Sequence, residues 1–251
     1  MLRDNLRNTE YFNEAISHCK DRINQYEVRI SNSEQLNPIG RVGASVGLFG
    51  FALNHLEFSY SRGDGIGSSK QVLVKLLKYR EMQQYYADAL PKEDAGRRLE
   101  WERLGFSHYK KILTWLAFAV SVGANQEYFE KLFLLVDNQG LDAVFDKIAV
   151  KLGDVDRAVS GKVLHAKPYS LLLEVIEAAP EQQVQLMIKF MDAWYPACVK
   201  NGFYETHNIT NNFGYAGYWC FEAALVAKVF NIDDSGFKDH KYYPAALMHE
   251  E

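Results

Sequence analysis

The sequence predicts an all-α protein, an irregular multi-helix bundle in which an N-terminal and a C-terminal helical half pack together. Three observations predict this fold class. Apolar residues recur at steps of three or four along almost the whole chain, which is the period of an amphipathic helix. Only 6 prolines and 17 glycines occur among 251 residues, and most lie between the periodic segments. No segment shows the alternation of polar and apolar residues that is typical of a half-buried strand.

The boundaries of the helices follow from the residues that interrupt this periodicity. Asn37 and Pro38 end the first helix, because a residue that precedes proline disfavours the helical conformation. Pro91 ends the third helix, and Pro180 separates two later ones. The periodic segments expected to be helical cover residues 2–34, 39–60, 71–90, 99–124, 126–138, 140–152, 169–178, 181–198 and 217–230.

A row of glycines marks one face of the second helix. Gly40, Gly43, Gly47 and Gly50 follow one another at steps of 3, 4 and 3. Each glycine lowers helix stability by about 1 kcal/mol relative to alanine. We therefore expect this face to allow another helix to approach closely.

Charge is distributed unevenly along the chain. Residues 1–120 hold 17 basic and 14 acidic side chains, whereas residues 121–251 hold 11 and 18, a formal charge of −7. We place the boundary between the two helical halves near this change, with one half at 1–122 and the other at 123–251. An acidic half repels nucleic acid, because phosphates carry the same charge. It suits a basic protein partner instead.

The sequence gives no sign of a cofactor, a metal or a membrane segment. The three cysteines, Cys19, Cys198 and Cys220, are odd in number and far apart, which indicates neither a disulfide framework nor a zinc site. The apolar runs Val42–Leu53 and Ile112–Ala124 are shorter than the roughly 20 residues that cross a bilayer. The first residues lack the apolar region of a secretory signal. We therefore expect a cytoplasmic protein, and the sequence indicates no particular oligomeric state.

Acidic side chains gather in the first part of the second half. Asp142 and Asp146 are four residues apart and would share a helical face. This acidic set has two interpretations: a solvated face with helix caps, or a negative surface that meets a basic partner. The set comprises Asp137, Asp142, Asp146, Asp154 and Asp156.

An irregular, asparagine-rich segment at residues 201–215 contains Tyr204, Glu205 and His207. Long loops on a helical scaffold often carry function. Glu205 and His207 could begin a metal or catalytic site, but no second pair at ligand spacing accompanies them. Partner contact and hydrogen bonds that fix the loop are the other two interpretations.

Glu222 stands in the middle of the most apolar helix. Its neighbours at helical spacing include Tyr218 and Trp219. A carboxylate in such surroundings must be paired or hydrogen-bonded. The sequence favours a buried anchor tied to a lysine, arginine or tyrosine of another helix. A catalytic acid with a raised pKa and simple surface exposure are the alternatives.

The same region carries a family resemblance. The sequence GYWCFEAALVAKVFNIDDS at residues 217–235, followed by FKDHKYYP at 237–244, resembles the signature of the PoNi family of immunity proteins against PoNe-type polymorphic DNase toxins. Upstream segments also resemble the family, in the same order along the chain. They are DNQG at 137–140, LHAKPY at 164–169, KF at 189–190, WY at 194–195 and YETH at 204–207.

The resemblance implies an all-helical protein without catalysis that binds a cognate DNase toxin in the cytoplasm of the producing cell. It also implies a role in interbacterial competition, with a toxin exported by contact-dependent or type VI-like secretion. We assign Asp137, Asp142, Asp146, Asp154, Asp156, Tyr204, Glu205 and His207 to the partner-binding surface. We assign Tyr218, Trp219, Glu222, Asp233 and Asp234 to a structural signature, with the aromatic residues and Glu222 in the core.

Two other functions stay open from the residues alone. One is a helical scaffold or adaptor that binds a different basic protein. The other is an enzyme that uses Glu205, His207 and Glu222 as acid, base or metal-binding groups. The enzyme hypothesis requires these three side chains to converge on one point.

Overall fold

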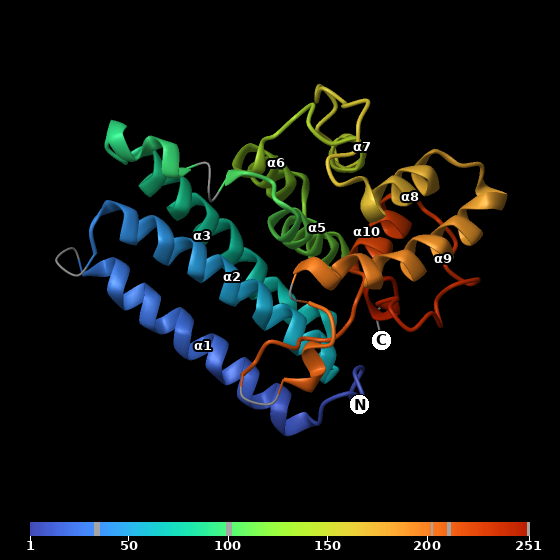
Figure 1. Cartoon of the computed structure of the whole chain (residues 1–251), viewed down its shortest axis with the longest axis horizontal. Coiled ribbons are helices and arrows are strands. Elements are labelled where there is room, and N and C mark those ends of the chain that lie inside the picture. The colour runs from blue at the N-terminus through green and yellow to red at the C-terminus, as the bar shows by residue number, and fades with distance from the viewer. Residues whose placement is uncertain (33–35, 99–101, 202, 210–211, 250–251) are drawn as a thin grey trace. The chain divides into compact units, whose positions relative to one another are not determined.

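The computed structural model describes residues 1–32, 36–98, 102–201, 203–209 and 212–249, and every regular element among them is a helix (Figure 1). The prediction of an all-α protein is confirmed. The α-helices are α1 (Thr9–Ser31), α2 (Pro38–Arg62), α3 (Lys70–Asp88), α5 (Phe106–Ser121), α6 (Gln126–Val136), α7 (Ala143–Lys151), α8 (Ala166–Glu177), α9 (Pro180–Ala197) and α10 (Phe221–Val229). Short 3-10 helices are η1 (Ile66–Ser69), η2 (Lys92–Arg97), η3 (Cys198–Asn201), η4 (Thr206–Asn208) and η5 (Ala245–Leu247).

Side-chain caps set the starts of the first two helices. The Asn8 side chain accepts a hydrogen bond from the Tyr11 N–H, so α1 begins at Thr9 and not at residue 2 as predicted. Asn37 caps α2 in the same way and places Pro38 in its first turn, where a proline costs no hydrogen bond. The predicted helix at 99–124 is described from Phe106 to Ser121, and residues 99–101 lie outside the described residues.

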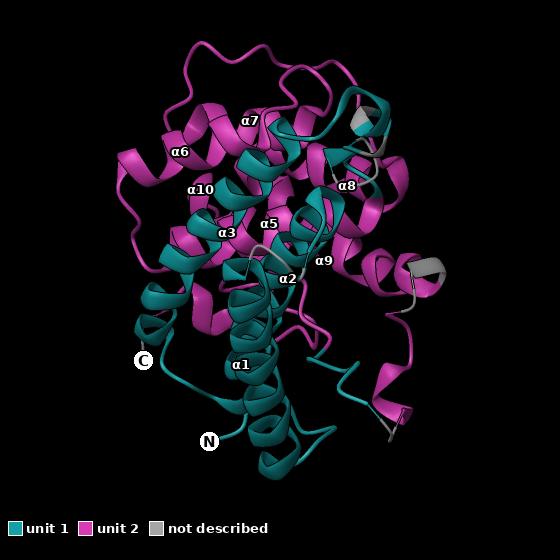
Figure 2. Cartoon of the chain, turned by 90° about the vertical axis from the view of Figure 1, so that its left-hand side faces the viewer, with its two compact units in different colours: residues 1–105, 210–217 teal, residues 106–209, 218–251 magenta. Residues whose placement is uncertain are grey.

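The chain divides into two compact units (Figure 2). Unit 1 comprises residues 1–105 together with residues 210–217, and unit 2 comprises residues 106–209 and 218–251. The predicted halves, 1–122 and 123–251, differ from these units mainly in where α5 and the 210–217 segment belong.

In unit 1, α2 packs against both α1 and α3. Residues 215 and 216 join these helices through buried or partly buried hydrogen bonds. The Tyr11 hydroxyl donates to the Tyr215 carbonyl at 2.8 Å, and the Ser61 hydroxyl donates to the Ala216 carbonyl at 2.6 Å. The Tyr215 hydroxyl in turn donates to the buried Asp4 carboxylate. Unit 1 is therefore completed by residues that come late in the sequence.

In unit 2, α8 packs against α9, α5 packs against α10, and α7 contacts both α8 and α10. Residues 221–227 of α10 are all buried, so this helix lies within the core of the unit. The largest fully buried side chains of unit 2 are Trp115, Trp194, Tyr109, Tyr169, Phe118, Phe145, Phe190 and Phe221. None of the helices in the described ranges is both long and apolar enough to cross a membrane.

Candidate partner-binding surface

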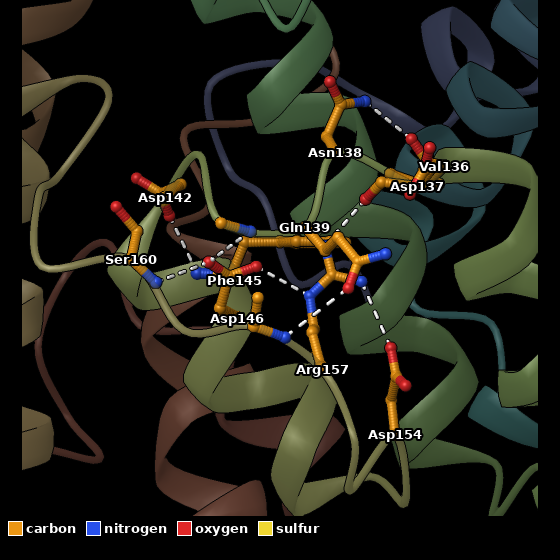
Figure 3. A network of polar contacts seen from close by, with 12 residues as sticks. Val136, Asp137, Asn138, Gln139, Asp142, Phe145, Asp146, Asp154, Arg157 and Ser160 are labelled. Carbon is orange, nitrogen blue, oxygen red and sulfur yellow. Dashed lines mark hydrogen bonds and ion pairs between the residues drawn. The ribbon is translucent and has the colours of Figure 1, made fainter.

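A buried ion pair lies at the centre of the region that carries the acidic residues (Figure 3). The Arg157 Nε donates to Asp146 Oδ1 at 2.6 Å, and the exposed fractions of the two side chains are 2% and 0%. The Arg157 Nη2 donates to the Asp137 carbonyl at 2.7 Å, and its Nη1 reaches Asp154 at 3.2 Å. The guanidinium also lies 4.9 Å from the centre of the Phe145 ring. Three polar partners and an aromatic face thus surround one buried cation.

The other oxygen of Asp146 binds backbone. Its Oδ2 accepts hydrogen bonds from the Gly140 N–H at 3.1 Å and the Ser160 N–H at 3.0 Å. Residues 140 and 160 lie on either side of α7 in the sequence. Asp146 therefore ties the segment before α7 to the loop after it, and Arg157 neutralises its charge.

Asp142 performs a similar task at the start of α7. It is the N-cap residue, and its Oδ1 accepts from the Phe145 N–H at 2.8 Å. The Tyr109 hydroxyl donates to the same oxygen at 2.8 Å, and the Leu164 N–H donates to Oδ2 at 2.8 Å. Burial, reinforced by the Asp142 carboxylate, raises the pKa of Tyr109 well above its ordinary value, so the phenol stays a hydrogen-bond donor.

These contacts correct part of the predicted surface. Asp142 and Asp146 were expected on a negative exposed face, but their exposed fractions are 1% and 0%. Both carboxylates are buried because each accepts several hydrogen bonds, from backbone N–H groups and from the Tyr109 hydroxyl or the Arg157 guanidinium. Their interpretation as exposed acids was wrong. Asp142 is the N-cap of α7, whereas the sequence placed it inside a helix at 140–152.

The remaining acids of the set lie at the surface to different degrees. Asp137 and Asp156 are exposed, and Asp154 is half-buried beside Arg157. Arg157 itself was not among the predicted site residues. The signal that could have found it is a lone arginine in a loop where Asp154 and Asp156 are its neighbours, since a buried cation needs acidic partners.

The predicted loop residues Tyr204, Glu205 and His207 lie beside an aromatic cluster. The Tyr204 ring stacks on Tyr195 with their centres 4.8 Å apart, and both Tyr204 and Glu205 are exposed. The Glu205 N–H donates to the Tyr195 hydroxyl at 3.2 Å. The His207 Nδ1 lies 2.7 Å from the Tyr218 hydroxyl. Hydrogen bonds thus fix the loop, while Tyr204 and Glu205 stay accessible to a partner.

Glu222 is a buried anchor, as the sequence favoured. Its exposed fraction is 0%, and its Oε1 accepts from the Tyr169 hydroxyl of α8 at 2.8 Å and from the Trp194 Nε1 of α9 at 3.3 Å. Burial, together with the nearby Glu222 carboxylate, raises the pKa of Tyr169 well above its ordinary value. Glu222 therefore links α10 to the α8–α9 pair.

The rest of the structural signature is only partly buried. Tyr218 is buried, but Trp219 is half-buried, so its placement in the core was wrong. Trp219 lies in residues 214–220, which precede α10 outside any helix, so the helical spacing assumed for it does not apply. Asp234 is buried and accepts from the Tyr243 hydroxyl at 3.2 Å. Asp233 is exposed and accepts from the Ser235 N–H at 3.0 Å in a turn.

The three side chains of the enzyme hypothesis lie in different environments. Glu222 is buried and bonds Tyr169 and Trp194, His207 is half-buried and contacts the Tyr218 hydroxyl, and the Glu205 side chain is exposed. Among the residues that the structure describes, no group of three His, Cys, Asp or Glu side chains is arranged to hold a metal ion.

The fold and this region define an all-α protein whose acidic C-terminal unit presents ordered, irregular loops. The chain belongs to the PoNe immunity protein (PoNi) family, since the model of the family's N-terminal part matches residues 3–134 and the model of its C-terminal part matches residues 140–247. The resemblance inferred from the sequence is confirmed.

One solved structure has the same fold. It is the crystal structure of protein PA2201 from Pseudomonas aeruginosa, which is 16% identical, with a TM-score of 0.73 over 98% of this chain and 89% of that chain. Among curated proteins, no relative matches the chain significantly.

Proposed function

We propose that this protein is an immunity protein that binds a cognate DNase toxin in the cytoplasm of the producing cell and neutralises it. The exposed acids Asp137 and Asp156, with Asp154 at their edge, form one part of the contact. Tyr204, Glu205 and His207 form the other part. The toxin is one exported in interbacterial competition by a contact-dependent or type VI-like system.

The observation that carries the proposal is the match to both parts of the immunity family, which together span nearly the whole chain. Charge supports it independently. A DNase needs a basic surface to bind phosphates, and a protein half with a formal charge of −7 is attracted to such a surface. The same charge repels DNA, so the protein does not compete for the toxin's substrate.

The proposed action is stoichiometric and not catalytic. Glu222 stabilises the core, and the predicted loop residues make contacts that fix the loop, so neither is placed for turnover. Nuclease–immunity pairs of other families reach a Kd of roughly 10⁻¹³ to 10⁻¹⁶ M. Inhibition should therefore be complete at one immunity protein for each toxin molecule.

The deciding experiment is a rescue of toxicity. The nuclease encoded beside this gene is expressed in a sensitive host with and without the protein, and the two are then purified together. Survival of the host and a stable one-to-one complex are expected. A scaffold for some other basic protein would leave the host unprotected, and that result would reject the proposal.

The surface is tested by charge reversal with a matched control. The test variant replaces three exposed acids of unit 2 by lysine: Asp137→Lys, Asp156→Lys and Glu205→Lys. The control variant makes the same change in net charge on unit 1: Glu14→Lys, Asp21→Lys and Glu81→Lys. The test variant should weaken toxin binding by well over 1 kcal/mol and the control by much less. Equal effects of the two variants would show that only net charge matters.

A further inference from the structure

Exposed aliphatic side chains are concentrated in the part of the sequence that carries the Arg157 network. Thirteen large apolar residues in the described ranges are exposed, and five of them lie between residues 134 and 164. Single exposed apolar residues are ordinary, but a group in one short stretch indicates an interaction site. The five are Leu134 (78% exposed), Leu141 (51%), Val155 (74%), Val159 (48%) and Leu164 (42%).

Three of these side chains, Val155, Val159 and Leu164, stand on a loop whose backbone is firmly held. We call residues 153–164 the clamped loop. Arg157 fixes it by its bond to Asp146, and the Ser160 N–H binds the same carboxylate at 3.0 Å. The Lys162 carbonyl accepts from the Ala143 N–H at 2.8 Å. The loop is thus ordered from within by polar contacts.

The clamp leaves Val155 and Val159 outside. Arg157 is buried, while Val155, Asp156 and Val159 on either side of it are exposed. The two valines are 74% and 48% exposed, so they add little apolar burial to their own unit. The order of the loop comes instead from its hydrogen bonds. A loop that is already ordered also loses little conformational entropy when it binds a partner. Rigid loops with exposed apolar tips of this kind are suited to insertion into another protein.

The exposed acidic side chains near the valines favour a basic protein as the partner. Asp156 lies between the two valines, and Asp137, whose carbonyl accepts from Arg157, is also exposed. A second copy of this loop would bring acid against acid, and nucleic acid would bring phosphate against acid. A basic protein surface that contains an apolar recess complements both features. The valines would occupy the recess, and the acids would meet cations at its rim.

We infer that the clamped loop is an anchor of the toxin contact, with Val155 and Val159 buried in an apolar recess of the nuclease's basic surface and Asp156 paired at the rim. This inference rests on the proposed function and names the part of the surface that sets the dissociation rate of the complex.

The test compares two double variants in toxin binding. Val155→Ser with Val159→Ser removes the apolar tips of the clamped loop. Val28→Ser with Val74→Ser makes the same change at valines that are 64% and 66% exposed on unit 1. The association and dissociation rates of the purified full-length proteins with the immobilised co-encoded nuclease are measured by surface plasmon resonance. The thermal unfolding of the proteins is also compared. Unchanged unfolding of both variants is expected, because all four valines are exposed.

The loop variant should dissociate about 30-fold faster or more, whereas the control should match the unmodified protein. Asp156→Asn should instead lower the association rate and its dependence on salt. A loop variant that dissociates no faster than the control overturns the inference and leaves the proposed function intact. If the unmodified protein forms no complex, both are overturned. If the unmodified chain is a dimer that the loop variant disrupts, a second copy covers the loop and the inference is overturned.

Discussion

Removing the positive charge of Arg157 tests the interpretation of the acidic region most directly. The side chain is 2% exposed and binds Asp146, which is 0% exposed. In Arg157→Met, the Asp146 carboxylate keeps its two backbone donors but loses the buried guanidinium that neutralises it. Breaking a buried pair by removing one partner costs about 3–5 kcal/mol. We expect the free energy of unfolding to fall by this amount.

A double-mutant cycle isolates the pair. Asp146→Asn should also be destabilising, by about 2–4 kcal/mol, because its single acceptor oxygen cannot serve both the Arg157 Nε and the Gly140 and Ser160 N–H donors. The variant with both changes should be more stable than the sum of the single effects predicts, by about 2 kcal/mol or more. Urea unfolding followed by tryptophan fluorescence gives these values, and Asp156→Asn is the control, with a change below about 0.5 kcal/mol.

Amide exchange gives a local measurement of the same effect. The Ser160 N–H should exchange at least about 100-fold faster in Arg157→Met, since tenfold corresponds to about 1.4 kcal/mol. Single variants that lose less than about 1 kcal/mol, or a cycle that is additive within about 0.5 kcal/mol, would refute the clamp. In that case the order of the loop would have to come from elsewhere.

Three further predictions follow from burial. Trp194→Ala should lower the free energy of unfolding by about 3–5 kcal/mol, while half-buried Trp219→Ala should cost about 1–2 kcal/mol, both measured in urea. Burial, reinforced by nearby cations, lowers the pKa of His55 to about 4, so the unfolded state binds the extra proton between about pH 6.5 and pH 4. Stability should therefore fall as pH drops through this window, by about 1–2 kcal/mol after allowance for solvent screening at this half-buried ring, and His55→Gln should remove the dependence. Burial raises the pKa of the Cys19 and Cys198 thiols to about 12, so a thiol reagent should label them only after unfolding.

Much of the helical fold is predictable because its signals are local. The prolines at positions 38 and 180 sit in the first turns of α2 and α9, and the spacing of apolar residues placed the helices between them. The start of α1 was placed too early because apolar periodicity continues through residues that are not helical. The Asn8 cap was the better signal there.

The glycine face of α2 illustrates a half-correct inference. A side chain at Gly47 would come within 2.9 Å of the Tyr26 ring on α1, so close helix approach does occur there. At Gly40 the nearest atoms belong to the preceding cap, and at Gly43 nothing lies within 4 Å. Spacing predicts which residues share a face, but it does not say which of them meets a neighbour.

The candidate site was harder to predict for a similar reason. Helical spacing predicted one exposed face for Asp142 and Asp146, but Asp142 precedes α7 as its N-cap and both carboxylates are buried by contacts from the loop after α7. The covering contacts come from Arg157, Ser160 and Leu164, which are 11 to 22 residues away from the acids they bind. Glu222 could be predicted because its own helix already surrounds it with apolar residues.

The hydrogen bonds of residues 215 and 216 to Asp4, Tyr11 and Ser61 have a consequence for synthesis of the chain. A ribosome that has made residues 1–105 has produced α1, α2 and α3 but not the partners of these buried polar groups. The N-terminal helices therefore reach their final packing only after residue 217 has left the exit tunnel. For the same reason, a hybrid of two such proteins joined after α3 would pair one protein's helices with the other protein's closing segment.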